Sequence, residues 1–149
     1  MISIDQIKQL RQETGVSISE CKKALVEAKG DIEKAKEILR KQGQDFAQTK
    51  AERETCEGIV ETYIHPNGKI GVMVELRCET DFVGSCEEFR KLAHELCLQI
   101  AAMNPANENS LLAQPWIRDE SKAIKNLIDE YIAKIGENIV IKRFVRYGM

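Results

Sequence analysis

The sequence of residues 59–77 is IVETYIHPNGKIGVMVELR, and this stretch decides the fold class. Asn-Gly at positions 67–68 is the strongest short-range signal for a β-hairpin when strand-forming residues stand on both sides of it. Residues 70–76 alternate between apolar and other side chains, which is the period-two pattern of a half-buried strand. A two-residue turn would give the cross-strand pairs Tyr63–Val72, Ile59–Leu76 and Glu61–Val74. The last pair places a carboxylate on the apolar face, so the hairpin is predicted while its register stays open.

Two helices and a third strand are expected after the hairpin. The first helix would begin with a capping box made by Ser85 and Glu88 and end at Asn-Pro in positions 104–105. Residues 106–114 are mostly polar and are expected to form a loop. A second helix is expected after Ser121, closed by a glycine at position 136.

The last strand shows a less regular pattern. Its residues Ile139, Ile141, Val145 and Tyr147 are expected on one side, with Arg143 interrupting the apolar run. The order strand, strand, helix, helix, strand over residues 55–149 predicts an α+β core, in which helices pack on one face of a three-stranded antiparallel sheet.

Residues 1–43 are expected to form three short helices. The residues that would cap them are Ser3 with Gln6, Ser17 with Glu20, and Asp31. Lys41-Gln42-Gly43 has the cation and the following glycine of a helix end. None of these helices is long enough to persist alone, so we expect them to pack together. Residues 44–54 are predicted to be a solvated helical linker.

Composition and charge exclude several functional classes. The chain has 149 residues, of which 43% are hydrophobic and 31% charged, as in a globular protein. Its 22 basic residues are interleaved with 24 acidic ones, without a block of like charges. Nucleic-acid binding needs clustered basic residues, so we expect no direct nucleic-acid partner.

The cysteines and histidines do not suggest a metal site. The five cysteines include no Cys-x-x-Cys pair, and there are only two histidines. That is a poor set of zinc ligands, so we expect reduced thiols, no metal and no cofactor. The first ten residues, MISIDQIKQL, lack the basic and apolar regions of a signal peptide. We expect a cytoplasmic protein without a membrane span.

No catalytic motif is present. The sequence contains neither a phosphate-binding Gly-x-x-x-x-Gly-Lys-Ser/Thr loop nor Gly-x-Gly-x-x-Gly nor Gly-x-Ser-x-Gly. Ser85, His94 and Asp81 could be written as a triad, but a triad is recognised by geometry and this spacing offers none. We therefore expect a protein that is not an enzyme, with His94 at the surface or in an interface.

The connection Cys78-Glu79-Thr80-Asp81-Phe82-Val83-Gly84 has two interpretations. It joins a strand to a helix and carries an aromatic and an aliphatic residue where a surface loop is expected. In the first interpretation Phe82 and Val83 tuck under the following helix, and Asp81 caps a turn. In the second, Phe82 is presented to a partner, since aromatic residues are frequent interface hot spots.

Several motifs, in the right order over nearly the whole chain, resemble the elongation factor Ts family. In the first third they are Leu10-Arg11, Thr14-Gly15, Cys21-Lys22-Lys23-Ala24-Leu25 and Gly30-Asp31-Ile32-Glu33-Lys34-Ala35. In the middle they are Tyr63-Ile64-His65, Asn67-Gly68-Lys69, Val74-Glu75-Leu76, Cys78-Glu79-Thr80-Asp81-Phe82-Val83 and Ala101-Ala102-Met103-Asn104-Pro105. At the end they are Gly136-Glu137-Asn138-Ile139-Val140 and Arg143-Phe144-Val145-Arg146.

The resemblance implies a guanine-nucleotide exchange factor for the translational GTPase elongation factor Tu. Residues 1–43 would be a module similar to ubiquitin-associated (UBA) domains that contacts the GTP-binding domain. Its implied contact residues are Leu10, Ile18, Cys21, Lys22 and Lys23. The exchange signature would be Thr80, Asp81, Phe82 and Val83, with Asp81 and Phe82 near the magnesium site of the GTPase.

The chain also departs from the family pattern. It has Val16-Ser17-Ile18-Ser19 where members usually have a Gly-Met-rich turn, and Gly84-Ser85-Cys86 where they often have Ala-Arg-Asn. It is a short form, and the exposed sheet of so small a core predicts a homodimer. The alternative function is a helical adaptor that binds another protein without exchange activity; a fold retained without exchange is also open.

Overall fold

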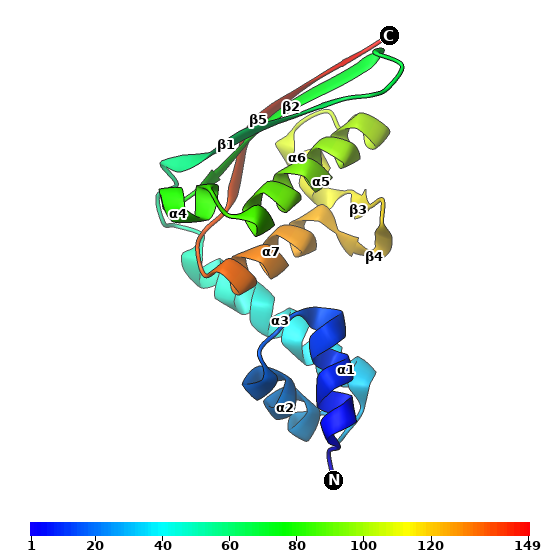
Figure 1. Ribbon diagram of the computed structural model, residues 1–149, viewed down its shortest axis with the longest axis vertical. Helices are drawn as coiled ribbons and strands as arrows, with labels where there is room; N and C mark the ends of the chain where they lie inside the picture. Colours follow the sequence, from blue (N-terminus) through cyan, green and yellow to red (C-terminus); the bar gives the residue numbers. More distant parts are fainter.

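The computed structural model describes all 149 residues, arranged as a small helical unit followed by a larger layered unit (Figure 1). The helical unit carries the N-terminus, and the C-terminus lies at the far end of the sheet. The helices are α1 (Ile4–Thr14), α2 (Ile18–Glu27), α3 (Ile32–Lys50), α4 (Asp81–Gly84), α5 (Glu87–Met103), α6 (Glu108–Ala113) and α7 (Ile124–Ile135). The strands are β1 (Glu57–Ile64), β2 (Ile70–Cys78), β3 (Pro115–Trp116), β4 (Asp119–Ala123) and β5 (Val140–Gly148).

The three predicted helix caps of the N-terminal unit are confirmed. Ser3 accepts from the backbone N–H of Gln6, whose side chain accepts from the backbone of Ser3 in return. The side chain of Ser17 accepts from the N–H of Glu20, and that of Asp31 from the N–H three residues on. Each cap satisfies a backbone donor that the first helical turn leaves free, so short-range sequence fixes where these helices begin.

The N-terminal unit encloses a small hydrophobic cluster. Seven buried residues form it: Leu10, Cys21, Ala24, Leu25, Ala28, Ala35 and Leu39. Most of these side chains are small, which lets α1, α2 and α3 approach closely but buries little apolar surface. The unit therefore has a complete but modest core of its own.

The predicted end of the third helix at positions 41–43 is wrong. Helix α3 runs without a break to Lys50, and Gly43 lies inside it. The residues expected to form a solvated linker are half of this helix, and Ala47 is buried in the core of the larger unit. Packing of α3 against α7 supplies the stabilisation that an exposed glycine-containing helix would lack.

The larger unit contains the predicted three-stranded antiparallel sheet, with the strand order β1-β2-β5. The hairpin register is the predicted one: Tyr63 pairs with Val72, Ile59 with Leu76 and Glu61 with Val74. The Glu61 side chain is half-buried and accepts from the N–H of Thr62.

The predicted face of the last strand is correct only for its first half. The register between β2 and β5 shifts between Glu75, which faces Arg143, and Leu76, which faces Ile141. One extra residue on β5 at this point reverses the alternation of its side chains. Ile141 therefore faces the core, whereas Val145 and Tyr147 are exposed on the opposite face.

Helices α5 and α7 cover the inner face of the sheet and complete a core of 19 buried residues (Figure 1). Helix α5 does not begin with the predicted Ser85–Glu88 capping box. Its N-cap is Cys86, which makes no side-chain hydrogen bond, and Ser85 instead ends the short helix α4. The extra turn of α4 displaces the start of α5 by one residue.

Residues 106–123 contain structure where the sequence predicts a loop and the start of a helix. Helix α6 and the ribbon of β3 and β4 lie here, so α7 begins only at Ile124. The ribbon is held by the buried amide of Gln99, which donates to the carbonyl of Pro115 at 3.0 Å and accepts from the N–H of Ile117 at 2.9 Å. These polar residues therefore obtain order from a tertiary contact with α5.

Every helix in this structure is too short or too polar to cross a membrane.

Candidate partner-binding site

The segment that joins β2 to α5 forms one helical turn, α4, on the flank of the sheet (Figure 1). Thr80 is its N-cap, and the hydroxyl of Thr80 accepts from the N–H of Val83 at 3.4 Å. Asp81 lies in the first turn, where a negative charge suits the positive end of a helix. Asp81 was expected to cap a turn, but the cap is Thr80.

Phe82 and Val83 lie in different environments. Val83 packs against the core of the larger unit, as expected if the segment tucks under the next helix. Phe82 does the opposite, with a side chain that is 85% exposed. A phenyl ring held in water forgoes about 1.5–3 kcal/mol of burial free energy, so this ring is available for a partner at little reorganisation cost.

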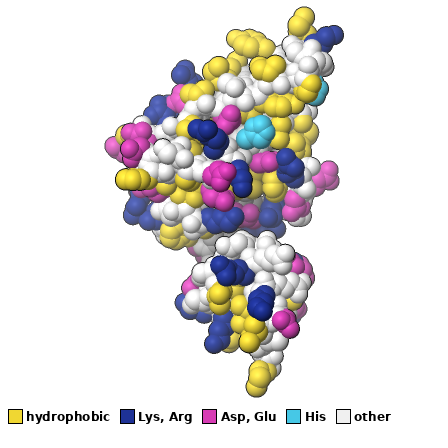
Figure 2. Space-filling model, in the orientation of Figure 1, with side chains coloured by type: hydrophobic (Ala, Val, Ile, Leu, Met, Phe, Trp, Pro, Cys, Tyr) yellow, Lys and Arg dark blue, Asp and Glu magenta, His cyan; other side chains and the backbone are white.

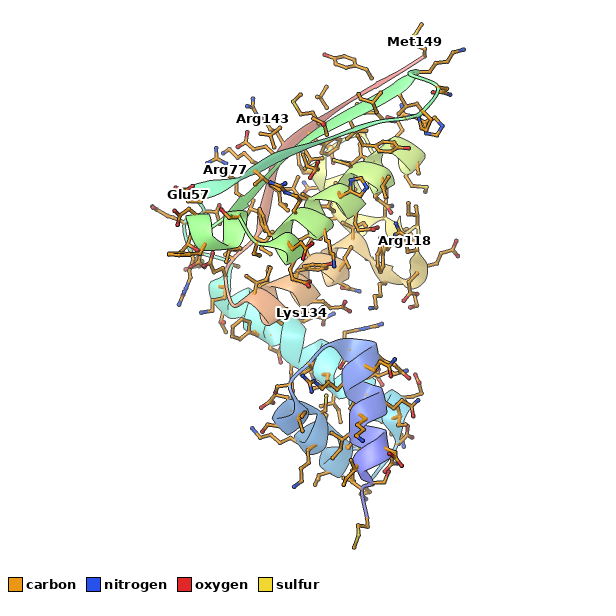
Figure 3. All side chains as sticks on the ribbon, in the orientation of Figure 1. Glu57, Arg77, Arg118, Lys134, Arg143 and Met149 are labelled. Carbon is orange, nitrogen blue, oxygen red and sulfur yellow. The ribbon has the colours of Figure 1, made fainter.

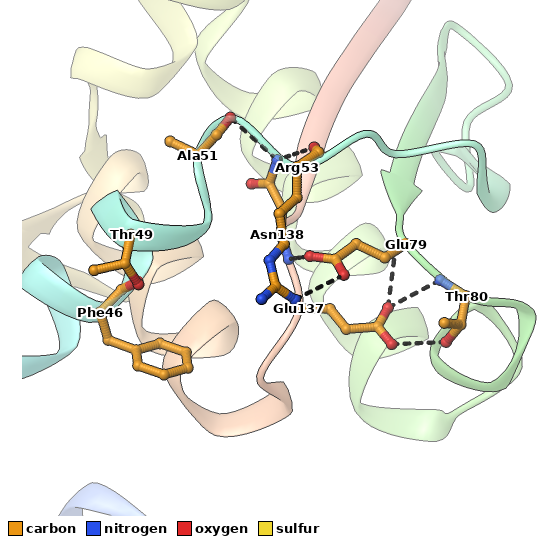
Figure 4. Close-up of polar contacts among 8 residues, drawn as sticks. All are labelled: Phe46, Thr49, Ala51, Arg53, Glu79, Thr80, Glu137 and Asn138. Carbon is orange, nitrogen blue, oxygen red and sulfur yellow. Dashed lines mark hydrogen bonds and ion pairs between the residues drawn. The ribbon is translucent and has the colours of Figure 1, made fainter.

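The turn is anchored by a network between two distant segments (Figure 4). One carboxylate oxygen of Glu137 accepts from the backbone N–H groups of Glu79 at 3.1 Å and Thr80 at 3.0 Å. Its other oxygen accepts from the Thr80 hydroxyl at 2.7 Å. The Glu79 carboxylate in turn accepts from the N–H of Asn138 at 2.8 Å.

A third segment joins the same network. The buried side-chain amide of Asn138 donates to the carbonyls of Ala51 at 3.4 Å and Arg53 at 2.9 Å, just beyond the end of α3. The Arg53 guanidinium lies 3.4 Å from the Glu79 carboxylate. Glu137 and Asn138 are part of a motif that the sequence analysis read only as a closing strand, so their role was missed.

The expected contact residues of the N-terminal unit divide into buried and exposed ones. Leu10 and Cys21 are fully buried in its core, so they pack the unit instead of presenting side chains to a partner. Ile18 is 55% exposed, and Lys22 and Lys23 are exposed as well. Lys23 pairs with Glu20 at 2.9 Å, a surface ion pair of small energetic weight.

A further exposed residue extends this surface along α2. Val26, which is 59% exposed, follows Ile18 and Lys22 at intervals of four residues, so the three lie on one side of the helix. Figure 2 shows apolar side chains flanked by basic ones on this unit. The spacing of these residues was visible in the sequence, but their exposure depends on how the helices pack.

The outer face of the sheet is a second exposed apolar region. Its large exposed side chains are Val60, Ile64, Met73, Val145 and Tyr147. Arg77 and Arg143 project from the same face (Figure 3), and both bind the Glu75 carboxylate. Hydrogen bonds from Arg77 first, and then from Arg143, lower the pKa of Glu75.

The cysteines and histidines of this region occupy structural positions. All five cysteines are free thiols, and burial raises the pKa of Cys78 to about 11 and that of Cys97 to about 12. A thiol with so high a pKa is a poor nucleophile at neutral pH. His94 is exposed on α5, as expected, and lies edge-on to Tyr63 at a centroid distance of 6.3 Å.

These features define a class of protein: an α+β chain with a helical head, whose exposed aromatic and apolar side chains suit contact with another macromolecule. The family model described as "Elongation factor TS" matches residues 4–107 and 79–149. The chain belongs to the elongation factor Ts family, and it is a translation elongation factor.

Curated relatives agree with this assignment. Elongation factor Ts of Caldanaerobacter subterraneus subsp. tengcongensis is 44% identical over 192 residues, covering 99% of this chain and 96% of the relative. Elongation factor Ts of Thermotoga maritima is 42% identical over 189 residues, covering 98% of this chain and 95% of the relative. Both alignments are longer than the 149-residue chain, so these relatives carry internal segments without a counterpart here.

Proposed function

We propose that this chain binds elongation factor Tu and promotes release of its GDP, so that the empty GTPase can take up GTP. The observation that carries the proposal is the exposed Phe82 ring on the turn of α4. The chain would act as a non-catalytic exchange factor without a cofactor, in the cytoplasm, where translation elongation takes place.

The mechanism follows from linkage between two ligands of one GTPase. A GTPase holds GDP through phosphate contacts and a magnesium ion. A factor that prefers the nucleotide-free state weakens GDP binding by the same ratio as GDP weakens binding of the factor. In this proposal Phe82 enters the GTPase near its magnesium site, and the exposed Asp81 forms hydrogen bonds beside it.

Phe82 alone is too small to supply the whole effect. Each tenfold loss of GDP affinity requires about 1.4 kcal/mol of differential binding. Further contact area would come from the N-terminal unit, where Ile18, Lys22 and Lys23 are exposed. In this proposal Thr80 and Val83 support the contact from within, because the hydroxyl of Thr80 caps the turn and Val83 packs on the core.

The experiment is release of fluorescent GDP from purified elongation factor Tu, with and without the chain. We expect a large acceleration by the unmodified chain, and its loss in Phe82→Ala without a change in melting temperature. Met103→Ala is the matched control, because it removes an exposed apolar side chain at the far end of α5. Binding without accelerated release would support the adaptor function, and no binding would overturn both.

We also propose that two copies of the chain associate through the outer face of the sheet. The five large apolar side chains exposed there would be covered in a dimer, and a two-fold axis could bring Glu75 of one copy near Arg143 of the other. The internal segments of longer relatives, absent here, could serve this purpose in those proteins.

Sedimentation over a range of concentrations tests this association. We expect a dimer for the unmodified chain and a monomer for Met73→Glu, which puts a charge on the outer face of the central strand. Val26→Glu is the control, since it places the same charge on an exposed apolar position in α2. A monomer at high concentration for the unmodified chain would reject the proposal.

A further inference from the structure

The helix that presents Phe82 is too short to hold its own direction. Helix α4 has only four residues, and a single helical turn is not stable by itself. Its position must therefore be imposed by neighbouring groups. The packing of Val83 fixes one side of the turn, but the start of the turn is held by hydrogen bonds.

Glu137 supplies these hydrogen bonds from a distant part of the chain. Its carboxylate accepts from the N–H groups of Glu79 and Thr80 and from the Thr80 hydroxyl, at 2.7–3.1 Å. Hydrogen bonds to an ionised carboxylate are stronger than those between neutral groups. Because the hydroxyl gives its proton to Glu137, its lone pair is directed to the N–H of Val83.

The connection that carries Glu137 is itself immobilised. Gly136 ends α7 in the left-handed conformation, with φ of 84°. On the other side, the N–H of Asn138 donates to the Glu79 carboxylate. Glu79 and Glu137 thus bind each other's segments reciprocally, although 58 positions separate them in the sequence. Figure 4 shows both carboxylates facing the opposite backbone.

We propose that Glu137 is a positioning residue for nucleotide exchange, which acts through Thr80 to fix the direction in which α4 presents Phe82. This inference rests on the proposed exchange function. It adds a residue outside the exchange signature on which exchange depends. Glu137 needs no contact with the GTPase to have this effect.

Glu137→Ala is the main variant, and Thr80→Val is the second one if the first does not fold. Thr80→Val removes the hydroxyl at nearly constant shape, and Thr80→Ser restores it. Glu120→Ala is the control, because Glu120 is an exposed carboxylate in the distant strand β4 and makes no side-chain hydrogen bond in this structure. Hydrogen exchange of the Glu79 and Thr80 amides reports whether the clamp is lost.

We expect Glu137→Ala and Thr80→Val to speed exchange of these amides, while the α5 amides stay protected. At saturating factor, both variants should release GDP roughly tenfold or more slowly than the unmodified chain, since small misplacements of a positioned group have effects of this order. Thr80→Ser and Glu120→Ala should remain close to the unmodified chain. In the Phe82→Ala background, Glu137→Ala should cause no further loss of release.

The outcomes separate the two proposals. If the unmodified chain does not accelerate GDP release, the proposed function fails and this inference fails with it. If the unmodified chain is active and Glu137→Ala is equally active despite faster amide exchange, only the role of Glu137 is overturned. An additional loss in the Phe82→Ala background would likewise reject the positioning role, because Glu137 would then act independently of Phe82.

Discussion

The two hydrophobic cores of the chain differ in the kind of residue that fills them. The N-terminal cluster has seven buried residues, and four of these, Cys21, Ala24, Ala28 and Ala35, are small. The cluster of the layered unit has 19 buried residues, with Phe89 the largest among its fully buried side chains. Burial free energy grows with apolar area, so the layered unit should be much the more stable of the two.

Helix α3 connects these unequal units. Its first half contributes Ala35 and Leu39 to the small core, and its second half contributes Ala47 to the large one. A continuous helix transmits position as well as stability, so the small unit gains a fixed mount on the large one. The comparison suggests that the exposed residues of α2 and Phe82 reach a partner as parts of one framework.

The largest expected effect is in the core of the layered unit. Phe89→Ala removes a fully buried ring and should lower the free energy of unfolding by about 3–5 kcal/mol. Trp116, the one tryptophan, packs against this core, and its fluorescence should report the loss in a urea titration. A change below about 1 kcal/mol would mean that the core adjusts to the cavity, against the close packing inferred here.

The matching truncation in the small core is Leu25→Ala. It should cost about 2–5 kcal/mol locally, but the small unit should open without unfolding the large one. Hydrogen exchange should show loss of protection in α1 and α2 with α5 unchanged. Equal loss of protection in α5 would show that the two units unfold as one.

A break in α3 should separate the units. Gly43→Pro removes a backbone donor inside the helix and should cost about 3 kcal/mol. We expect the N-terminal unit to move relative to the layered unit, which a larger radius of gyration in small-angle scattering would reveal. An unchanged radius would indicate that contacts outside α3 hold the two units together.

The matched substitution at the same position should act in the opposite direction. A Cβ at Gly43 would meet the Cβ of Ala133 at 3.6 Å, an ordinary van der Waals contact. Gly43→Ala should therefore stabilise the chain by about 0.5–1 kcal/mol, because alanine favours a helix over glycine. Thermal unfolding measures this, and a decrease in stability would mean that α3 and α7 are packed too tightly for a methyl group.

The smallest effect is on thiol labelling, which leaves the stability of the chain unchanged. At pH 8 a thiol reagent should modify the exposed Cys56 first. Cys21 should follow as the small unit opens, and Cys97 should react last because its pKa is about 12 and its unit opens rarely. Mass spectrometry of the labelled peptides gives the order, and Cys97 reacting before Cys21 would reverse the proposed ranking of the two units.

Local patterns predicted much of this structure because they depend on residues close in sequence. The caps at Ser3, Ser17 and Asp31 each join groups three residues apart. The hairpin and its register follow from the turn at positions 67–68. The reversal of β5 was missed because a bulge is set by pairing with another strand, which the alternation of one segment does not contain.

The candidate site was predicted in part. Its location between β2 and α5 was expected from the motif, but periodicity favoured neither burial nor exposure of Phe82 over the other. Exposure of Phe82 and burial of Val83 depend on how α4 sits against the core. Leu10 and Cys21 were expected at the surface, yet three packed helices enclose them.

The sequence by itself determined the α+β class, the helix starts of the N-terminal unit, the hairpin and the family, because each is encoded in short motifs and their order. The tertiary structure alone decided that α3 belongs to both units and that Glu137 holds the turn bearing Phe82. These features join groups far apart in the chain, and such contacts exist only once the intervening residues have folded.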